Sequence, residues 1–167
     1  MHLLEKLQLD NNIICKIQNL ELLVNLKWLD LSFNLIEKIE GLETLTQLTD
    51  LSLFSNQIKE LRGLDNLKQL NVLSVGSNLI ASYQPAIEYL RGLTNKLEVL
   101  KMSDNPFSKF QEHEYKLHAI AYLKELKYLD YELVEDETRE KANEKYKEEI
   151  QEKENQKAAE KQDENQY

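Results

Sequence analysis

LKWLDLSFNLI, residues 26–36, decides the fold of this chain, because nearly the same pattern of residue types recurs every 22 residues. Leu29 and Leu31 alternate with residues of other types, and this period of two predicts a short strand with one buried face. An asparagine follows each predicted strand, at positions 12, 34, 56 and 78. Its amide has donors and an acceptor, so it can bond backbone groups of its own turn and of the neighbouring unit.

The 22-residue step aligns whole columns of apolar residues. The shared pattern, L-x-x-L-x-L-x-x-N-x-I, is that of a leucine-rich repeat. The sequence therefore predicts an α/β solenoid with short parallel strands on the concave side and 3-10 or short helices on the convex side, stacked over one shared core. Four of the columns are Leu4, Leu26, Leu48, Leu70; Leu7, Leu29, Leu51, Leu73; Leu9, Leu31, Leu53, Val75; and Ile14, Ile36, Ile58, Ile80.

One further column predicts the path of the convex side. It contains Asn19, Gly41 and Gly63, and both residue types tolerate a positive φ. We therefore expect a left-handed kink at these positions. A unit of 22 residues leaves little room for a long helix, so the convex segments are predicted to be 3-10 turns or single helical turns.

The pattern changes toward the C-terminus. Asn105 follows Asn78 by 27 residues, and the inserted segment, 84–94, has helical spacing. We divide the chain into about five repeats at 1–106, a C-terminal cap at 107–131, and an acidic helical tail at 132–167 that is partly disordered unless bound. The first strand starts almost at residue 1, so we also expect a missing N-terminal cap or missing repeats. The tail carries one stripe, formed by Thr138, Ala142, Tyr146 and Ile150.

Composition argues against several kinds of partner. The formal charge is −9 and no basic stripe occurs, so we expect neither a nucleic acid nor a membrane surface as the partner. Cys15 is the sole cysteine, which excludes an intramolecular disulfide and fits a reducing compartment. No run of about 18 apolar residues occurs in the sequence.

Residues with catalytic or metal-binding chemistry form no recognisable motif. His113 and His118 are five residues apart, which does not put both imidazoles on one helical face. No base is recognisable near Cys15, and no glycine pair forms a phosphate-binding loop. We therefore expect no enzyme activity, no cofactor and no metal site.

The positions that alternate with the buried leucines should line the concave side and offer a binding surface. Trp28, Phe54 and Tyr128 are aromatic residues on a face that should be exposed to solvent, and exposed aromatic side chains are typical of interface anchors. The alternative is that Trp28 and Tyr128 lie flat and shield the strands. The predicted protein-binding residues are Trp28, Asp30, Ser32, Asp50, Ser52, Phe54, Val72, Ser74, Lys101, Tyr128 and Asp130.

The repeats resemble a known class. The segment 36–42, IEKIEGL, and the cap 121–131, AYLKELKYLDY, are similar to the class of the leucine-rich regulatory subunit of protein phosphatase 1. Residues 28–34, WLDLSFN, and 50–54, DLSLF, with the cap and the charged helix after it, resemble the leucine-rich-repeat subunit of the nexin–dynein regulatory complex of motile cilia. The resemblance covers roughly residues 3–146.

That resemblance implies a role. The chain would be a scaffold in the cytoskeleton of the ciliary axoneme, would bind other subunits of the complex or an axonemal dynein, would help to regulate ciliary motility, and would not form a homo-oligomer. Two alternatives stay open. One is a regulatory subunit of a protein phosphatase, and the other is a protein like the spliceosomal leucine-rich subunit.

Overall fold

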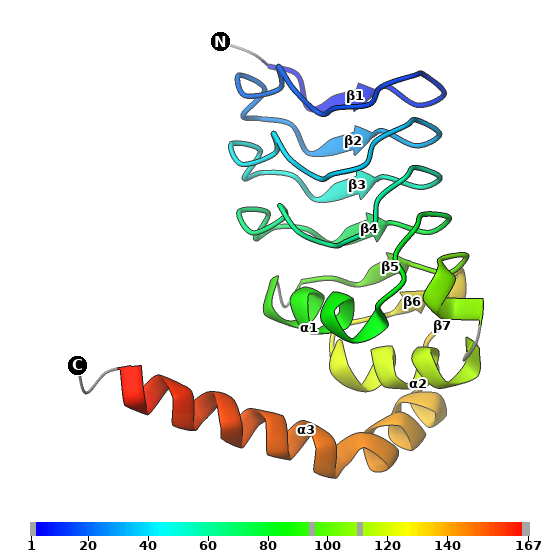
Figure 1. Ribbon diagram of the computed structural model, residues 1–167, viewed down its shortest axis with the longest axis vertical. Coiled ribbons are helices and arrows are strands. Elements are labelled where there is room, and N and C mark those ends of the chain that lie inside the picture. The colour runs from blue at the N-terminus through cyan, green and yellow to red at the C-terminus, as the bar shows by residue number, and fades with distance from the viewer. Residues whose placement is uncertain (1–2, 94–95, 110–111, 165–167) are drawn as a thin grey trace.

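A computed structural model describes residues 3–93, 96–109 and 112–164. The described residues form one seven-stranded sheet in which the strand order follows the chain, and successive strands are stacked along the long axis of the molecule (Figure 1). The first six strands are parallel, and the last is antiparallel to its neighbour. The strands are β1 (Lys6–Gln8), β2 (Trp28–Asp30), β3 (Asp50–Ser52), β4 (Val72–Ser74), β5 (Val99–Lys101), β6 (Tyr128–Leu129) and β7 (Glu132–Leu133).

The predicted leucine core is confirmed. Strand register places Leu29 beside Leu51 and Leu51 beside Leu73, and all three side chains are fully buried. Each such leucine contributes about 1.5–3 kcal/mol, and a single unit could not bury it alone. The first unit is different, since Leu4 is 42% exposed whereas Leu26, its equivalent in the second unit, is 0% exposed.

Buried asparagines join neighbouring units, as the sequence predicts. The Oδ1 atom of Asn56 accepts a hydrogen bond from the backbone N–H of Ile36 at 3.0 Å. Its Nδ2 atom donates to the carbonyl oxygens of Leu31 at 3.0 Å and Leu53 at 3.1 Å. Equivalent bonds recur at Asn34, Asn78 and Asn105, so backbone groups that would otherwise be buried unpaired are satisfied along the stack.

The convex side of the first three units consists of consecutive tight turns. In the second unit, the N–H of Leu45 bonds the carbonyl of Leu42, and the N–H of Leu48 bonds that of Leu45, each at 3.0 Å. The predicted left-handed column is confirmed, because φ is 71° at Gly41 and 78° at Gly63. A methyl group on Gly63 would lie 2.1 Å from the carbonyl oxygen of Ile39, so close stacking also requires glycine there.

Helices replace turns at the C-terminal end, where α1 (Tyr83–Leu93) is the convex segment of the fourth unit. The 3-10 helix η1 (Pro106–Lys109) and α2 (Glu112–Tyr122) follow β5, and α3 (Asp136–Glu164) closes the chain. Figure 1 shows α3 running beneath α2 at the end of the stack opposite β1.

The contact between α2 and α3 uses the stripe seen in the sequence. Ala142 is fully buried, and Tyr146 and Ile150 pack against the same core. The guanidinium of Arg139 donates to the carbonyl oxygens of Ile120 and Leu126. The first half of α3 therefore covers the end of the solenoid.

The asparagine bonds predict a large loss of stability for Asn56→Ala. The change leaves the Ile36 N–H and two carbonyl groups without their partner in a dry interior, so we expect the free energy of unfolding to fall by about 3 kcal/mol. Asn12→Ala is the matched control, because Asn12 is exposed and bonds only carbonyls of its own unit. Its cost should stay below about 0.5 kcal/mol. Urea denaturation followed by circular dichroism measures both, and equal losses would contradict the role given to the amide.

Gly63→Ala should also destabilise the fold, by about 2–3 kcal/mol, because the added methyl group strains a left-handed residue and meets a backbone oxygen. Gly92 offers the control, since a methyl group there would meet nothing within 4 Å. Within helix α1, Gly92→Ala should raise stability by about 0.5–1 kcal/mol. Thermal unfolding of the two variants should shift in opposite directions, and a shift in the same direction would refute this account.

Candidate protein-binding surface

The first and third residues of the strands form one face of the sheet, which we call the concave face. In β2 to β5 the central residue is buried and the two flanking residues are half-buried. Parallel register aligns the first positions into one row and the third positions into another. Of the predicted binding residues, the structure brings together on or beside this face Trp28, Asp30, Asp50, Ser52, Phe54, Val72, Ser74, Lys101 and Tyr128.

Local hydrogen bonds hold the polar side chains of this face. A carboxylate oxygen of Asp30 accepts a bond from the backbone N–H of Ser32 at 2.9 Å. The hydroxyl groups of Ser32 and Ser52 are 2.6 Å apart. The sequence predicts that Ser32 faces solvent, but its side chain is buried and its hydroxyl group bonds that of Ser52. Ser32 therefore orders the surface and does not itself present a hydroxyl group to a partner.

Asp130 also differs from the expectation, because it is buried and lies at the end of the sheet. One carboxylate oxygen accepts bonds from the backbone N–H groups of Met102 and Ser103, both at 2.8 Å. The other accepts a bond from the hydroxyl group of Tyr115 at 2.5 Å. In an earlier unit the corresponding N–H, that of Val75, bonds a carbonyl of the next strand. The carboxylate thus replaces a missing next unit, and Asp130 is a structural cap.

The turn at Asp130 explains why the sequence pattern was misread there. Asp130 and Tyr131 both have positive φ, at 50° and 70°, as a two-residue type I′ hairpin requires. The hairpin connects β6 to the antiparallel β7. The alternation of a parallel strand therefore ends at Leu129, and Asp130 points into the end of the core.

Phe33 is a surface residue that the sequence analysis missed. Its side chain is 50% exposed, and its ring contacts that of Phe54 edge-on, with ring centroids 5.5 Å apart. Its φ is 54°, a left-handed conformation that costs a non-glycine residue about 1–2 kcal/mol. The same column holds Asn11, Ser55, Ser77 and Asp104, also with positive φ. An aromatic residue in a column of small polar residues was the signal that could have identified it.

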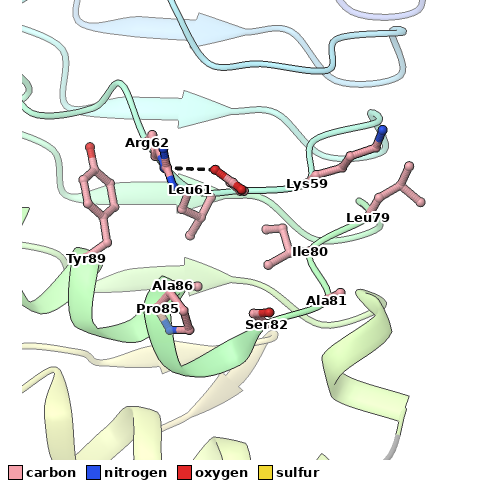
Figure 2. A pocket seen from close by; sticks show the side chains of 11 residues that line it. Lys59, Leu61, Arg62, Leu79, Ile80, Ala81, Ser82, Pro85, Ala86 and Tyr89 are labelled. Carbon is pink, nitrogen blue, oxygen red and sulfur yellow. Dashed lines mark ion pairs between the residues drawn. The ribbon is translucent and has the colours of Figure 1, made fainter.

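A cavity of about 570 Å³ opens between the third unit and α1 (Figure 2). Apolar side chains such as Leu61, Ile80 and Ala86 line it, and Arg62 pairs with Glu60 beside it at 2.9 Å. Figure 2 shows Pro85, Ala86 and Tyr89 reaching it from α1. The cavity lies where the longer fourth unit departs from the regular stacking of turns. Its lining contains no histidine or cysteine.

A polar cluster joins α1, α2 and α3. The Nδ1 atom of His118 lies 2.9 Å from the Tyr83 hydroxyl group, and its Nε2 atom lies 3.4 Å from a Glu149 carboxylate oxygen. The imidazole stacks on the ring of Tyr122 with centroids 4.1 Å apart. Burial lowers the pKa of His118, and the nearby Glu149 carboxylate opposes that shift only in part. Lys153 bridges Glu88 and Glu149 at 2.8 and 3.3 Å, so the cluster ties α3 to the repeats.

The remaining candidate residues do not assemble into a chemical site. The side chain of His113 lies outside the described residues, and His118 belongs to the α3 contact. Cys15 is exposed, and its sulfur atom lies 3.5 Å from the carbonyl oxygen of Ile13. Within the described ranges, no three or more His, Cys, Asp or Glu side chains are grouped as a metal site would need. Nor is any helix in those ranges long and apolar enough to cross a bilayer.

Comparison with known proteins agrees with this geometry. Residues 24–66 match the family model for leucine-rich repeats in two copies. A chain of the Drosophila melanogaster SNF/U2A' complex is similar, with 26% identity, a TM-score of 0.75, and coverage of 88% of this chain and 87% of that chain. An internalin of Listeria monocytogenes, InlF, is 27% identical over 78% of this chain and 36% of its own length, with a TM-score of 0.62. No curated protein matches the sequence.

The chain therefore has a leucine-rich-repeat fold similar to that of the SNF/U2A' structure, in which an open sheet of parallel strands is followed by C-terminal helices. Such domains bind other proteins.

The His118 cluster predicts a specific pH dependence of stability. Folding lowers the pKa of His118 from its ordinary value of 6.5, so the unfolded chain binds a proton more readily. The contribution of His118 to the free energy of unfolding is present above pH 6.5 and is lost as the pH falls below that value. His118→Gln should flatten the decline in unfolding free energy between pH 7.5 and 5.5, and urea denaturation across that range measures it.

The comparison isolates His118 because His2 and His113 are the same in both proteins. The groups that face the imidazole are Tyr83, Tyr122, Tyr146, Glu149 and Lys153. The pKa values of Tyr83, Tyr122 and Lys153 are raised and that of Glu149 is lowered, so all four shifts lead away from the pH window chosen. An unchanged slope in the variant would show that His118 is not the group responsible.

Proposed function

We propose that this protein is a non-catalytic scaffold whose concave face binds a protein partner. The observation that carries the proposal is the contact between the partly exposed rings of Phe33 and Phe54, together with Trp28 at the first position of β2, over hydrogen-bonded strands. Aromatic side chains on a rigid backbone lose little conformational entropy on binding, which makes them effective anchors. The strands hold these side chains in place before any partner arrives.

The partner assembly that the sequence favours is the nexin–dynein regulatory complex of motile cilia. Support comes from the resemblance at residues 28–34 and 50–54 and from the cap followed directly by a charged helix. In the structure, α3 begins at Asp136 and packs on α2, and only its C-terminal end, after Glu154, extends past the solenoid (Figure 1). The chain would use the concave face for one subunit or an axonemal dynein, and the extended part of α3 for helical subunits.

A second candidate is a subunit of a protein complex, as in the SNF/U2A' complex. The specific support is that the similarity to that structure spans nearly all of both chains. This candidate keeps the same binding face but needs no axoneme. A phosphatase regulatory subunit is the remaining alternative, and its support is the resemblance of residues 36–42 and of the cap.

Localisation and rescue in a motile ciliated cell test the proposal. The tagged chain should lie along the axoneme, and its deletion should reduce beating. The wild-type chain should restore beating, whereas Trp28→Ala combined with Phe54→Ala should restore less than about a tenth of it, because hot-spot anchors each contribute a tenfold or greater factor in affinity. Lys38→Ala, an exposed change on the convex side, is the control and should rescue fully.

Other outcomes would redirect the assignment. Wild-type chain that is absent from the axoneme, and that co-purifies with a phosphatase catalytic subunit, would favour the phosphatase alternative. Full rescue by the double variant, shown to be folded by circular dichroism, would remove the concave face from the binding role.

A further inference from the structure

We infer that Arg91 and Lys124 form a binding site for a carboxylate group of an acidic partner segment, and that Glu154 of α3 occupies this site as an internal competitor. The site lies at the C-terminal end of the stack, where α3 passes beneath α2 (Figure 1). It is separate from the concave face and does not depend on the role proposed for that face.

A pocket of about 250 Å³ lies among α1, the end of α2 and α3. Leu97, Tyr122 and Leu123 give it an apolar lining, and all three side chains are buried. Two cations, Arg91 and Lys124, belong to the same lining. In a chain with a formal charge of −9, a pair of cations beside an apolar surface favours an anion at this place.

The guanidinium group of Arg91 is positioned before any anion binds. The Arg91 side chain is 17% exposed, and its central guanidinium carbon lies 5.1 Å from the centre of the Tyr122 ring. That ring is itself held, because it stacks on the His118 imidazole with centroids 4.1 Å apart and its hydroxyl group donates to Glu149 at 2.9 Å. A guanidinium group seated on an aromatic ring loses little conformational entropy when it binds a carboxylate.

Glu154 shows that a carboxylate fits this pocket. The Nη2 atom of Arg91 donates to Oε1 of Glu154 at 2.7 Å, and the Nζ atom of Lys124 lies 3.9 Å from the same oxygen. Glu125 also lines the pocket, and its negative charge opposes a doubly charged phosphate group more than a single carboxylate. The ligand chemistry is therefore that of an Asp or Glu side chain with an apolar residue beside it.

The internal carboxylate is held weakly. Ile150 packs against the apolar core, but Lys153 and Glu154 are attached through ion pairs, with Glu88 at 2.8 Å and with Arg91 at 2.7 Å. Partly exposed ion pairs contribute little free energy, and a helix end with few apolar contacts opens locally at small cost. The last turns of α3 therefore detach readily, and each detachment opens the pocket.

Binding of a partner and release of α3 are coupled. An acidic segment binds only while Glu154 is away, so its apparent affinity is reduced according to the fraction of molecules in which the site is open. A bound segment in turn keeps the end of α3 detached by the same factor. The site thus links capture of an acidic partner to release of residues 151–164.

Peptide titration of the full chain, followed by NMR, tests the inference. The probe is a synthetic peptide of residues 150–160, which carries Glu154 in its own sequence. In the chain variant Glu154→Gln the internal competitor loses its charge and keeps its helix propensity, so the peptide should bind about two- to fivefold more tightly than it binds the wild type. The matched control, Glu152→Gln, changes an exposed residue two positions away and should leave the affinity unchanged.

Two substitutions in the Glu154→Gln chain identify the cations. Arg91→Gln should abolish the gain in affinity for the peptide. Lys124→Gln should weaken the binding about twofold, and it changes a side chain that is 72% exposed, so folding is not at risk. Circular dichroism verifies the fold of each variant.

Hydrogen exchange measures the release directly. In Glu154→Gln the backbone N–H groups of residues 151–164 should exchange about two- to fivefold faster than in the wild type, because one of the attaching ion pairs is lost. Those of residues 139–146 should exchange at the wild-type rate, since they belong to the part of α3 that packs on the cap.

The inference fails if the peptide binds the wild type and Glu154→Gln equally well, or if its binding survives Arg91→Gln and Lys124→Gln together. Unchanged exchange in residues 151–164 of Glu154→Gln would show that Glu154 does not hold the end of α3. Inorganic phosphate that displaces the peptide at a lower concentration than acetate does would also overturn the inference, because the site would then select phosphate over a carboxylate.

Discussion

Buried polar backbone at each turn is the constraint on which this solenoid depends. Every coil of the chain bends inward after its strand and carries N–H and C=O groups into a leucine interior, where water cannot form hydrogen bonds with them. The side-chain amide of each buried asparagine reaches one unit back and bonds both kinds of group. Leucine burial supplies most of the favourable free energy, but the amides fix the spacing and register at which the units stack.

The register between strands also determines which side chains are neighbours on the concave face. Because the strands align residue by residue, a side chain at one strand position always stands beside its equivalents in neighbouring units. Trp28 and Asp50, which are 22 positions apart in the sequence, thus become direct neighbours on the face of the sheet. Hydrogen bonds also order this face, because Ser32 bonds Ser52 through its hydroxyl group and Asp30 through its backbone N–H.

The repeat region was predictable from sequence because its information is local and repeated. The core leucines, the asparagine bonds and the left-handed column at Gly41 and Gly63 each follow from residue type and spacing. Three features were not predicted, each for its own physical reason. Asp130 left the strand pattern because a hairpin turn at one position overrode the alternation. Phe33 was missed because what distinguishes it is its backbone conformation, and the His118 cluster because it joins residues up to 65 positions apart with no periodic pattern.

The carboxylate of Asp130 prevents a further repeat from stacking on the C-terminal end of the sheet. It occupies the hydrogen-bonding positions that another coil would need, so at that end the register is already complete. An additional repeat could be inserted between two existing asparagine units, because each face of a coil is complementary to the next coil. A duplicated stretch of 22 codons inserted there would find neighbours on both sides. It would lengthen the concave surface by about 4.8 Å and leave the terminal helices undisturbed. The length of the concave surface can therefore change by duplication of a repeat within the gene alone.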